Sequence, residues 1–221
     1  MNSLIEPDLR QMHDYIMLLG GEVETAIERA MRALLTSNSE LARQVMADDD
    51  RIDALELAAD RHSLRVLALK APTACDLRFV VSASKIATLL ERLGDHACSI
   101  ARAALALKEE PRFQPYPDLP DMARFVCEML HSAIDLFADW DAATARRIID
   151  CDDELDLLYD RLFHELLAEV ARNSSVANQA THLVLVAKHL KQIGDRTKDI
   201  CNEVAYMNEA AMINHNWLVI S

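Results

Sequence analysis

The chain has 221 residues, of which 51% are apolar, so it is long and apolar enough to bury a sizeable core. Its formal net charge of -13 repels the phosphate backbones of nucleic acids, and no run of Lys or Arg forms a basic groove, so we predict no direct nucleic-acid binding. No apolar run approaches the roughly 20 residues of a membrane span, and the start lacks the pattern of a secretory signal. These features predict a cytoplasmic protein that meets membranes only through its partners.

The first half of the sequence has the apolar periodicity of three helices. Gly20 and Gly21 fall inside the first one, and each glycine costs about 1 kcal/mol relative to Ala in a helix. The pair therefore predicts a kink or a close approach by another backbone, and we favour close helix packing. Pro72 ends the second, since the residue before proline avoids the helical region. The predicted spans are Asp8 to Ser37, Ser39 or Asp48 to about Lys70, and Asp76 to Glu109.

A proline-rich segment separates the two halves of the chain. Residues 109 to 120 hold four of the six prolines, a density that breaks helices, so we predict domains at 1–110 and 121–221 joined by a linker at 111–120. The second half repeats the helical pattern. Its predicted spans are Asp121 to Asp139, Ala142 to Arg172, and Val176 to Met212.

The third helix of each half carries the same stretch of sequence. A shift of 100 positions superposes residues 86 to 100 on residues 186 to 200, with Gly94 on Gly194 and Asp95 on Asp195. Internal duplication of this kind favours two similar units over one large domain. We therefore predict an all-α fold made of two tandem three-helix bundles.

Carboxylates gather on two helices of the first half. Glu91 and Asp95 lie one helical turn apart, nearly opposite the apolar seam of the third helix. On the second helix, a stripe composed wholly of acids follows helical spacing: Asp49, Asp53, Glu56 and Asp60. Asp49 and Asp53 facing Glu91 and Asp95 would crowd four negative charges into one patch, which is unfavourable unless a cation neutralises them. Oxygen ligands suit Mg, Mn, Ca or iron, and the candidate ions are iron, Mn, Mg or Zn. The alternative is that both stripes are ordinary solvated faces of an acidic protein.

The second half repeats only part of this acidic set. Tyr159 and Phe163 replace Glu56 and Asp60, and Lys191 replaces Glu91. Because its ammonium lies one turn from Asp195, Lys191 offsets part of the charge there, so we predict tighter metal binding in the first half. The acids that remain as candidate metal ligands in the second half are Asp152, Asp156, Asp195 and Asp199.

Several segments resemble the PhoU family of phosphate-transport accessory proteins. The segments are ERLGDHACSIA, QIGDRTKDICNEVAY, DDRIDALE at 49 to 56, APTACDLRFVVSASKIA at 71 to 87, and DDELDLLY at 152 to 159. In that family, the third helix of each half carries an acidic residue that is followed by three other residues and then by Asp. Here Lys191 stands where the second motif of the family has Glu.

The resemblance implies a cytoplasmic negative regulator of phosphate uptake and of phosphate-responsive genes. Its partners would be the ATPase subunit of the phosphate importer and a sensor histidine kinase. It also implies multinuclear metal clusters held on the bundle surface by the acidic motifs. We further expect a homodimer or a higher homo-oligomer.

Other candidate sites are weaker. Glu128 and His131 form the ExxH spacing of ferritin-like di-iron bundles, but no second ExxH aligns with it. His62 lies in an apolar seam, which favours a core or interface histidine over a ligand. Five scattered cysteines without a CxxC spacing favour reduced packing thiols, and no nucleophile with its base is apparent, so we predict no enzyme. A ferritin-like oxidase or store, and a metal-free helical scaffold, remain as alternatives to the regulator.

Overall fold

The structure is a computed structural model that describes residues 5–108, 118–139, 148 and 152–209. Helices account for nearly all of this part of the chain, and no strand occurs within it. The all-α prediction and the tandem duplication are confirmed. The elements are α1 (Glu6–Thr36), α2 (Ser39–Lys70), α3 (Ala74–Ala106), α4 (Asp118–Asp139), α6 (Asp152–Arg172), the short 3-10 helix η1 (Ser174–Val176) and α7 (Ala177–Glu209).

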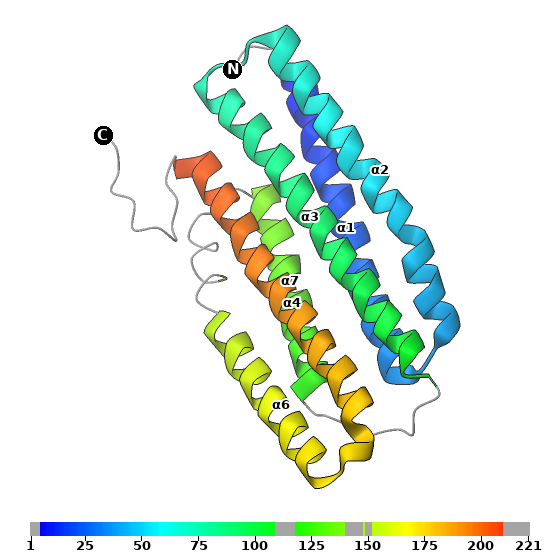
Figure 1. Cartoon of the computed structure of the whole chain (residues 1–221). Coiled ribbons are helices and arrows are strands. Elements are labelled where there is room, and N and C mark those ends of the chain that lie inside the picture. The colour runs from blue at the N-terminus through cyan, green and yellow to red at the C-terminus, as the bar shows by residue number, and fades with distance from the viewer. Residues whose placement is uncertain (1–4, 109–117, 140–147, 149–151, 210–221) are drawn as a thin grey trace.

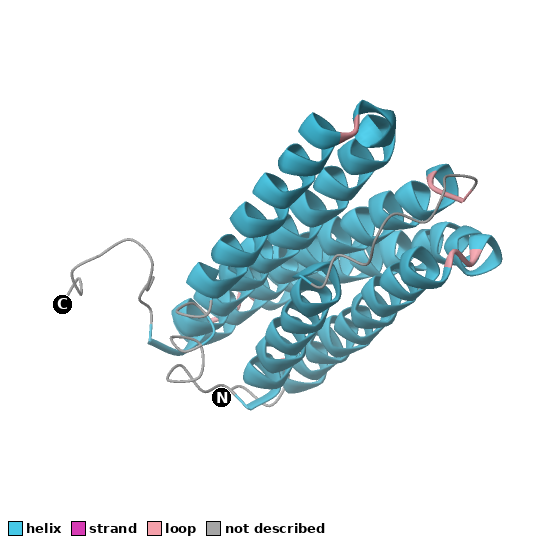
Figure 2. Ribbon diagram, turned by 90° about the horizontal axis from the view of Figure 1, so that it is seen from below, coloured by secondary structure: helices cyan, strands magenta, loops and turns pink. Residues whose placement is uncertain are grey.

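The helices run along one common direction (Figure 2). In Figure 1, α2 and α6 form the two edges of the molecule, α3 and α7 lie side by side between them, and α1 and α4 pack behind. None of the described helices has the length and apolar character of a membrane span. The two halves of the chain contact each other where α3 packs against α7 and where α1 packs against α4.

Local sequence signals fix where the helices begin and end. The second helix starts at Ser39 rather than Asp48, because the Asn38 side chain accepts a hydrogen bond from the Leu41 backbone N–H at 3.0 Å and caps the helix. It ends before Pro72, as predicted. The fourth helix begins at Asp118, three residues before the predicted start, because Pro120 is tolerated within the first turn of a helix. Positions 142–151 and 210–212 of the predicted helices lie outside the described residues, apart from Ile148, which is helical and buried. Residues 111–117 of the predicted linker also lie outside them, whereas its last three positions, 118–120, belong to α4.

One continuous apolar core runs through both halves. Phe137 of α4 is fully buried, and its ring stacks on His13 of α1 at 5.3 Å and on Phe79 of α3 at 6.2 Å between ring centroids. Aromatic pairs at such distances add packing energy beyond the area they bury. The halves are thus joined by shared core packing in addition to the covalent linker.

The predicted close approach occurs at Gly20. A Cβ atom at this position would lie 2.5 Å from Cδ1 of Ile134, which is closer than real Cβ contacts allow. At Gly21, by contrast, a Cβ would meet nothing within 4 Å. Gly20 therefore lets α4 pack against α1, and α1 continues through both glycines without a break.

A buried carboxylate ties the start of α1 to the end of α2. Asp8, whose side chain is 9% exposed, accepts a hydrogen bond from Arg65 at 3.1 Å and pairs with Lys70 at 3.1 Å. His62 Nε2 lies 2.9 Å from the backbone carbonyl oxygen of Asp8, and because a carbonyl only accepts, Nε2 carries the proton. His62 is buried at this contact, so its predicted role as an interface histidine is confirmed.

We expect Asp8→Asn to lower the free energy of unfolding at pH 7 by roughly 1–3 kcal/mol, the usual loss when a charged hydrogen bond is removed. Burial raises the pKa of Asp8, but the hydrogen bonds from Lys70 and Arg65 lower it more, so the net pKa lies below the ordinary 3.8. The stabilisation is therefore present above pH 4 and is lost as the pH falls through the folded-state pKa. Urea unfolding at pH 7 and pH 3 measures it.

The exposed Asp14 supplies the control for this prediction. Asp14→Asn should leave stability within about 0.5 kcal/mol of the original chain, as surface substitutions usually do. Equal losses for the two variants would show that the Asp8 contacts contribute no stability.

Candidate functional site

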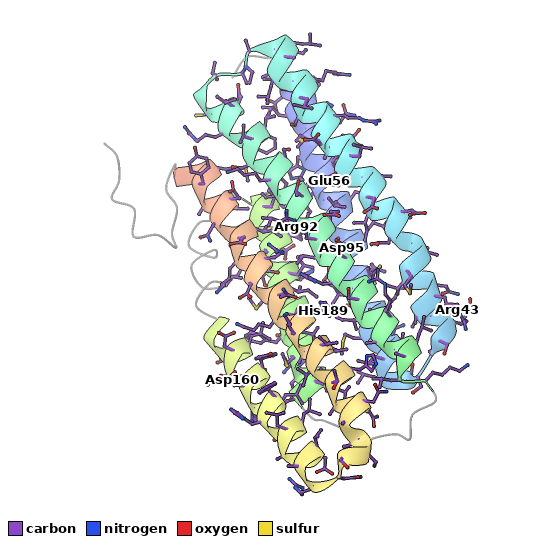
Figure 3. All side chains as sticks on the ribbon, in the orientation of Figure 1. Arg43, Glu56, Arg92, Asp95, Asp160 and His189 are labelled. Atoms are coloured by element: carbon purple, nitrogen blue, oxygen red, sulfur yellow. The ribbon has the colours of Figure 1, made fainter. Side chains whose placement is uncertain are left out.

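The acidic stripe of α2 faces that of α3. Ser84 donates a hydrogen bond to Asp60 at 3.3 Å, and one turn further along, Thr88 donates to Glu56 at 3.1 Å. Because the two helices are antiparallel neighbours, the same register continued along them sets Asp53 opposite Glu91 and Asp49 opposite Asp95. Figure 3 shows Glu56 and Asp95 along this α2–α3 boundary. We call Asp49, Asp53, Glu56, Glu91 and Asp95 the first patch.

A glycine brings the two helices of the first patch together. A Cβ atom at Gly94 would lie 3.1 Å from the Ile52 side chain and 3.4 Å from Oδ1 of Asp49. This is tighter than most Cβ contacts, so glycine at this position lets α2 pack closely beside Asp95. The Gly-Asp pair found in the repeated sequence thus has a structural reason in the first half.

Mutual repulsion marks the first patch. Burial, followed by the Asp95 and Asp53 carboxylates, raises the pKa of Glu91. Burial also raises the pKa of Asp49; a hydrogen bond with Cys98 opposes this rise and the carboxylates of Asp53 and Asp95 add to it. Within the described part of the chain, no Lys, Arg or His forms an ion pair with any carboxylate of this patch. The patch therefore concentrates negative charge, which Arg102 near Asp49 and Arg92 near Glu91 offset only in part.

The donor atoms of the first patch suit a hard cation. All of its charged ligands are carboxylate oxygens, and burial raises the pKa of the neighbouring Cys98 thiol to about 12, so no thiolate is present to select a soft metal. As the side chains stand, no three His, Cys, Asp or Glu residues among those described converge on one point. Binding of an ion would therefore require rotation of exposed side chains such as Asp53 and Asp95.

A lysine occupies the corresponding place in the second half. Lys191 Nζ of α7 donates a hydrogen bond to Oδ1 of Asp156 on α6, and it lies 3.9 Å from Oδ1 of Asp195. The predicted proximity of Lys191 to Asp195 is confirmed. Asp199 lies one turn beyond Asp195, and burial raises its pKa, an effect that Arg196 opposes. We call Asp156, Lys191, Asp195 and Asp199 the second patch; the side chain of Asp152 lies outside the described residues.

A histidine pair between the two patches was not predicted. His96 of α3 and His189 of α7 place their Nδ1 atoms 3.2 Å apart at the contact between the halves. Burial, followed by the neighbouring His189, lowers the pKa of His96 to about 4. The duplication gave no sign of this pair, because a shift of 100 sets His96 on Arg196. Only the antiparallel packing of α3 on α7 brings the two rings together.

The ExxH pair of α4 does not build a ferritin-like centre. Glu128 accepts a hydrogen bond from Arg124 at 3.0 Å, while His131 Nδ1 lies 3.1 Å from Glu24 of α1. Glu128 and His131 are both exposed. A ferritin-like site needs carboxylates that project into the bundle core. In the described part of the chain, the acids that are buried lie at helix starts: Asp8, Asp76 and Asp118.

Comparison with known proteins decides the family. A family model described as "PhoU domain" matches the chain twice, over residues 16–104 and 119–204. The chain belongs to the PhoU family. Each match falls within one half, so both halves are PhoU domains.

Relatives of this family align over most of the chain. A phosphate-specific transport system accessory protein PhoU homolog of Zymomonas mobilis is 37% identical over 91% of this chain and 85% of its own length. The homolog of Aquifex aeolicus is 35% identical over 94% of each chain. The crystal structure of PhoU from Pseudomonas aeruginosa, at 30% identity, superposes with a TM-score of 0.91 over 94% of this chain and 100% of that one. The PhoU resemblance drawn from the sequence is confirmed.

Proposed function

We propose that this chain is a cytoplasmic negative regulator of phosphate uptake and of phosphate-responsive genes. The observation that carries the proposal is the alignment of nearly the whole chain, both halves included, with phosphate-specific transport system accessory proteins. The names of these relatives describe accessory proteins and no catalysed reaction. The chain would act by binding, as an adaptor between the importer's ATPase subunit and a sensor histidine kinase, and as a homodimer or higher homo-oligomer.

Cation binding by the first patch is part of this proposal. Asp49 and Asp53 from α2, with Glu91 and Asp95 from α3, would hold divalent or trivalent ions such as iron, Mn, Mg or Zn. The raised pKa values of Asp49 and Glu91 support this, because burial, the larger cause, and the repulsion between neighbouring carboxylates both disfavour charges that a cation would neutralise. A bound ion would supply the positive charge that offsets these carboxylates of α2 and α3.

Deletion of the gene should raise phosphate uptake and derepress phosphate-starvation genes in phosphate-rich medium, because the negative regulator of both is lost. Uptake of labelled phosphate and transcript levels measure the two effects, and a plasmid copy of the gene should reverse them. Pull-down of the tagged chain from phosphate-replete cells should retain the importer's ATPase subunit and the kinase. Unchanged uptake and transcripts, in a strain with no second copy of the gene, would refute the regulatory function.

A further inference from the structure

Lys191 stands at the position where the first half carries a carboxylate. The repeat sets Lys191 on Glu91 and Asp195 on Asp95, and a shift of 103 sets Asp156 on Asp53. In the first patch these three positions are all acidic. In the second patch one of them is an ammonium, and the other two are the carboxylates that flank it.

The ammonium lies between two helices, as a bridging cation would. Nζ donates to Asp156 on α6 and lies 3.9 Å from Asp195 on its own helix. The Lys191 side chain is 27% exposed, whereas those of Asp156 and Asp195 are each 46% exposed. The Lys191 side chain is therefore more buried than the two carboxylates that it joins.

The second half also lacks counterparts of Glu56 and Asp60, two acids of the α2 stripe. Tyr159 and Phe163 of α6 occupy the places of Glu56 and Asp60, and their rings stack with centroids 6.2 Å apart. Where α2 has two negative charges, α6 thus has an apolar contact. An incoming ion would meet fewer carboxylates and would have to displace an ammonium already bound to them.

We infer that Lys191 takes, in the second half, the place that a metal cation takes in the first, so that α6 and α7 are linked without metal. This rests on the proposed cation site of the first patch only for the comparison; the contacts of Lys191 stand independently. The consequence is an asymmetric regulator. Cation binding changes the stability of the packing between α2 and α3, while the stability of the packing between α6 and α7 does not depend on the cation.

The first test measures the lysine bridge in metal-free buffer with a chelator. Lys191→Met should lower the Tm by about 2–4 °C, the shift that loss of a partly exposed ion pair produces in a chain of this size. Asp156→Asn should cost little when added to Lys191→Met, because its partner is already gone. Lys188→Met, an exposed lysine on the same helix, is the matched control. Equal Tm values for Lys191→Met and Lys188→Met would overturn the inference.

The second test asks whether removal of the ammonium creates a metal site. Titration with Mn2+, followed by electron paramagnetic resonance of the free ion, should show more Mn2+ bound per chain in Lys191→Glu than in the original protein. No gain would overturn the inference. If the original protein binds no Mn2+ but Lys191→Glu does, the first-patch cation site is refuted, and the role of Lys191 is still supported. The two proposals therefore fail separately.

Discussion

Gly20→Leu is expected to lower the free energy of unfolding by about 2–3 kcal/mol, because overpacking a close helix contact forces side chains and backbone apart. Even a Cβ at this position would lie 2.5 Å from Ile134, and leucine adds three further carbon atoms beyond it. The contact joins α1 of one half to α4 of the other. The loss should appear in urea unfolding monitored by circular dichroism.

The adjacent glycine supplies a matched control for this prediction. A Cβ at Gly21 meets nothing within 4 Å, so Gly21→Leu should raise stability by roughly 0.5–1 kcal/mol through helix propensity alone. Ile134→Ala should make room for the new side chain, so the double variant with Gly20→Leu should be more stable than the sum of the single losses predicts. Similar effects of leucine at both glycines would show that α1 and α4 do not approach each other at Gly20.

Glu91→Gln should make the metal-free chain more stable at pH 7, by roughly 0.2–1 kcal/mol, the range of partly exposed charge interactions. Burial and the carboxylates of Asp95 and Asp53 raise the pKa of Glu91 above its ordinary 4.5, so the folded state holds this proton more tightly than the unfolded state. The repulsion is present above the raised pKa and is relieved as the pH falls through it. The advantage of the variant should therefore shrink between pH 7 and pH 4.

The same substitution should weaken Mn2+ binding by about 10–100-fold, because affinity of a hard-cation site follows the number of charged ligands. Urea unfolding in chelator at pH 7 and pH 4, together with Mn2+ titration, measures both effects. Glu154→Gln, which removes an exposed acid of α6, serves as control and should change neither. A Glu91→Gln variant that is less stable without metal and binds Mn2+ as before would show that Glu91 belongs to an ordinary solvated face.

The sequence was sufficient to predict the helices and the duplication. Apolar periodicity and Pro72 are local signals, and they located α1, α2 and α3 to within a few residues. The packing of one half on the other was not predictable in the same way. The approach of Gly20 to Ile134, and of His96 to His189, depends on how distant helices pair, and a repeat in the sequence carries no information about that.

The candidate site was predicted in part for the same reason. Helical spacing placed the acids of α2 on one stripe and those of α3 on another, but only the register set by Thr88 with Glu56 shows that the stripes face each other. The proximity of Lys191 to Asp195 followed from spacing within one helix. Its hydrogen bond with Asp156 crosses from α7 to α6, and it became visible only with the structure.

Mn2+ binding by three chains tests most directly whether the first patch is a cation site and the second is not. The three are the original protein, Asp95→Asn in the first patch, and Asp195→Asn at the equivalent position of the second. Equilibrium titration at pH 7, with free Mn2+ followed by electron paramagnetic resonance, gives the ions bound per chain. We predict that the original protein and Asp195→Asn bind Mn2+ alike and that Asp95→Asn loses it. Absence of binding in all three, or loss in Asp195→Asn alone, would contradict this account.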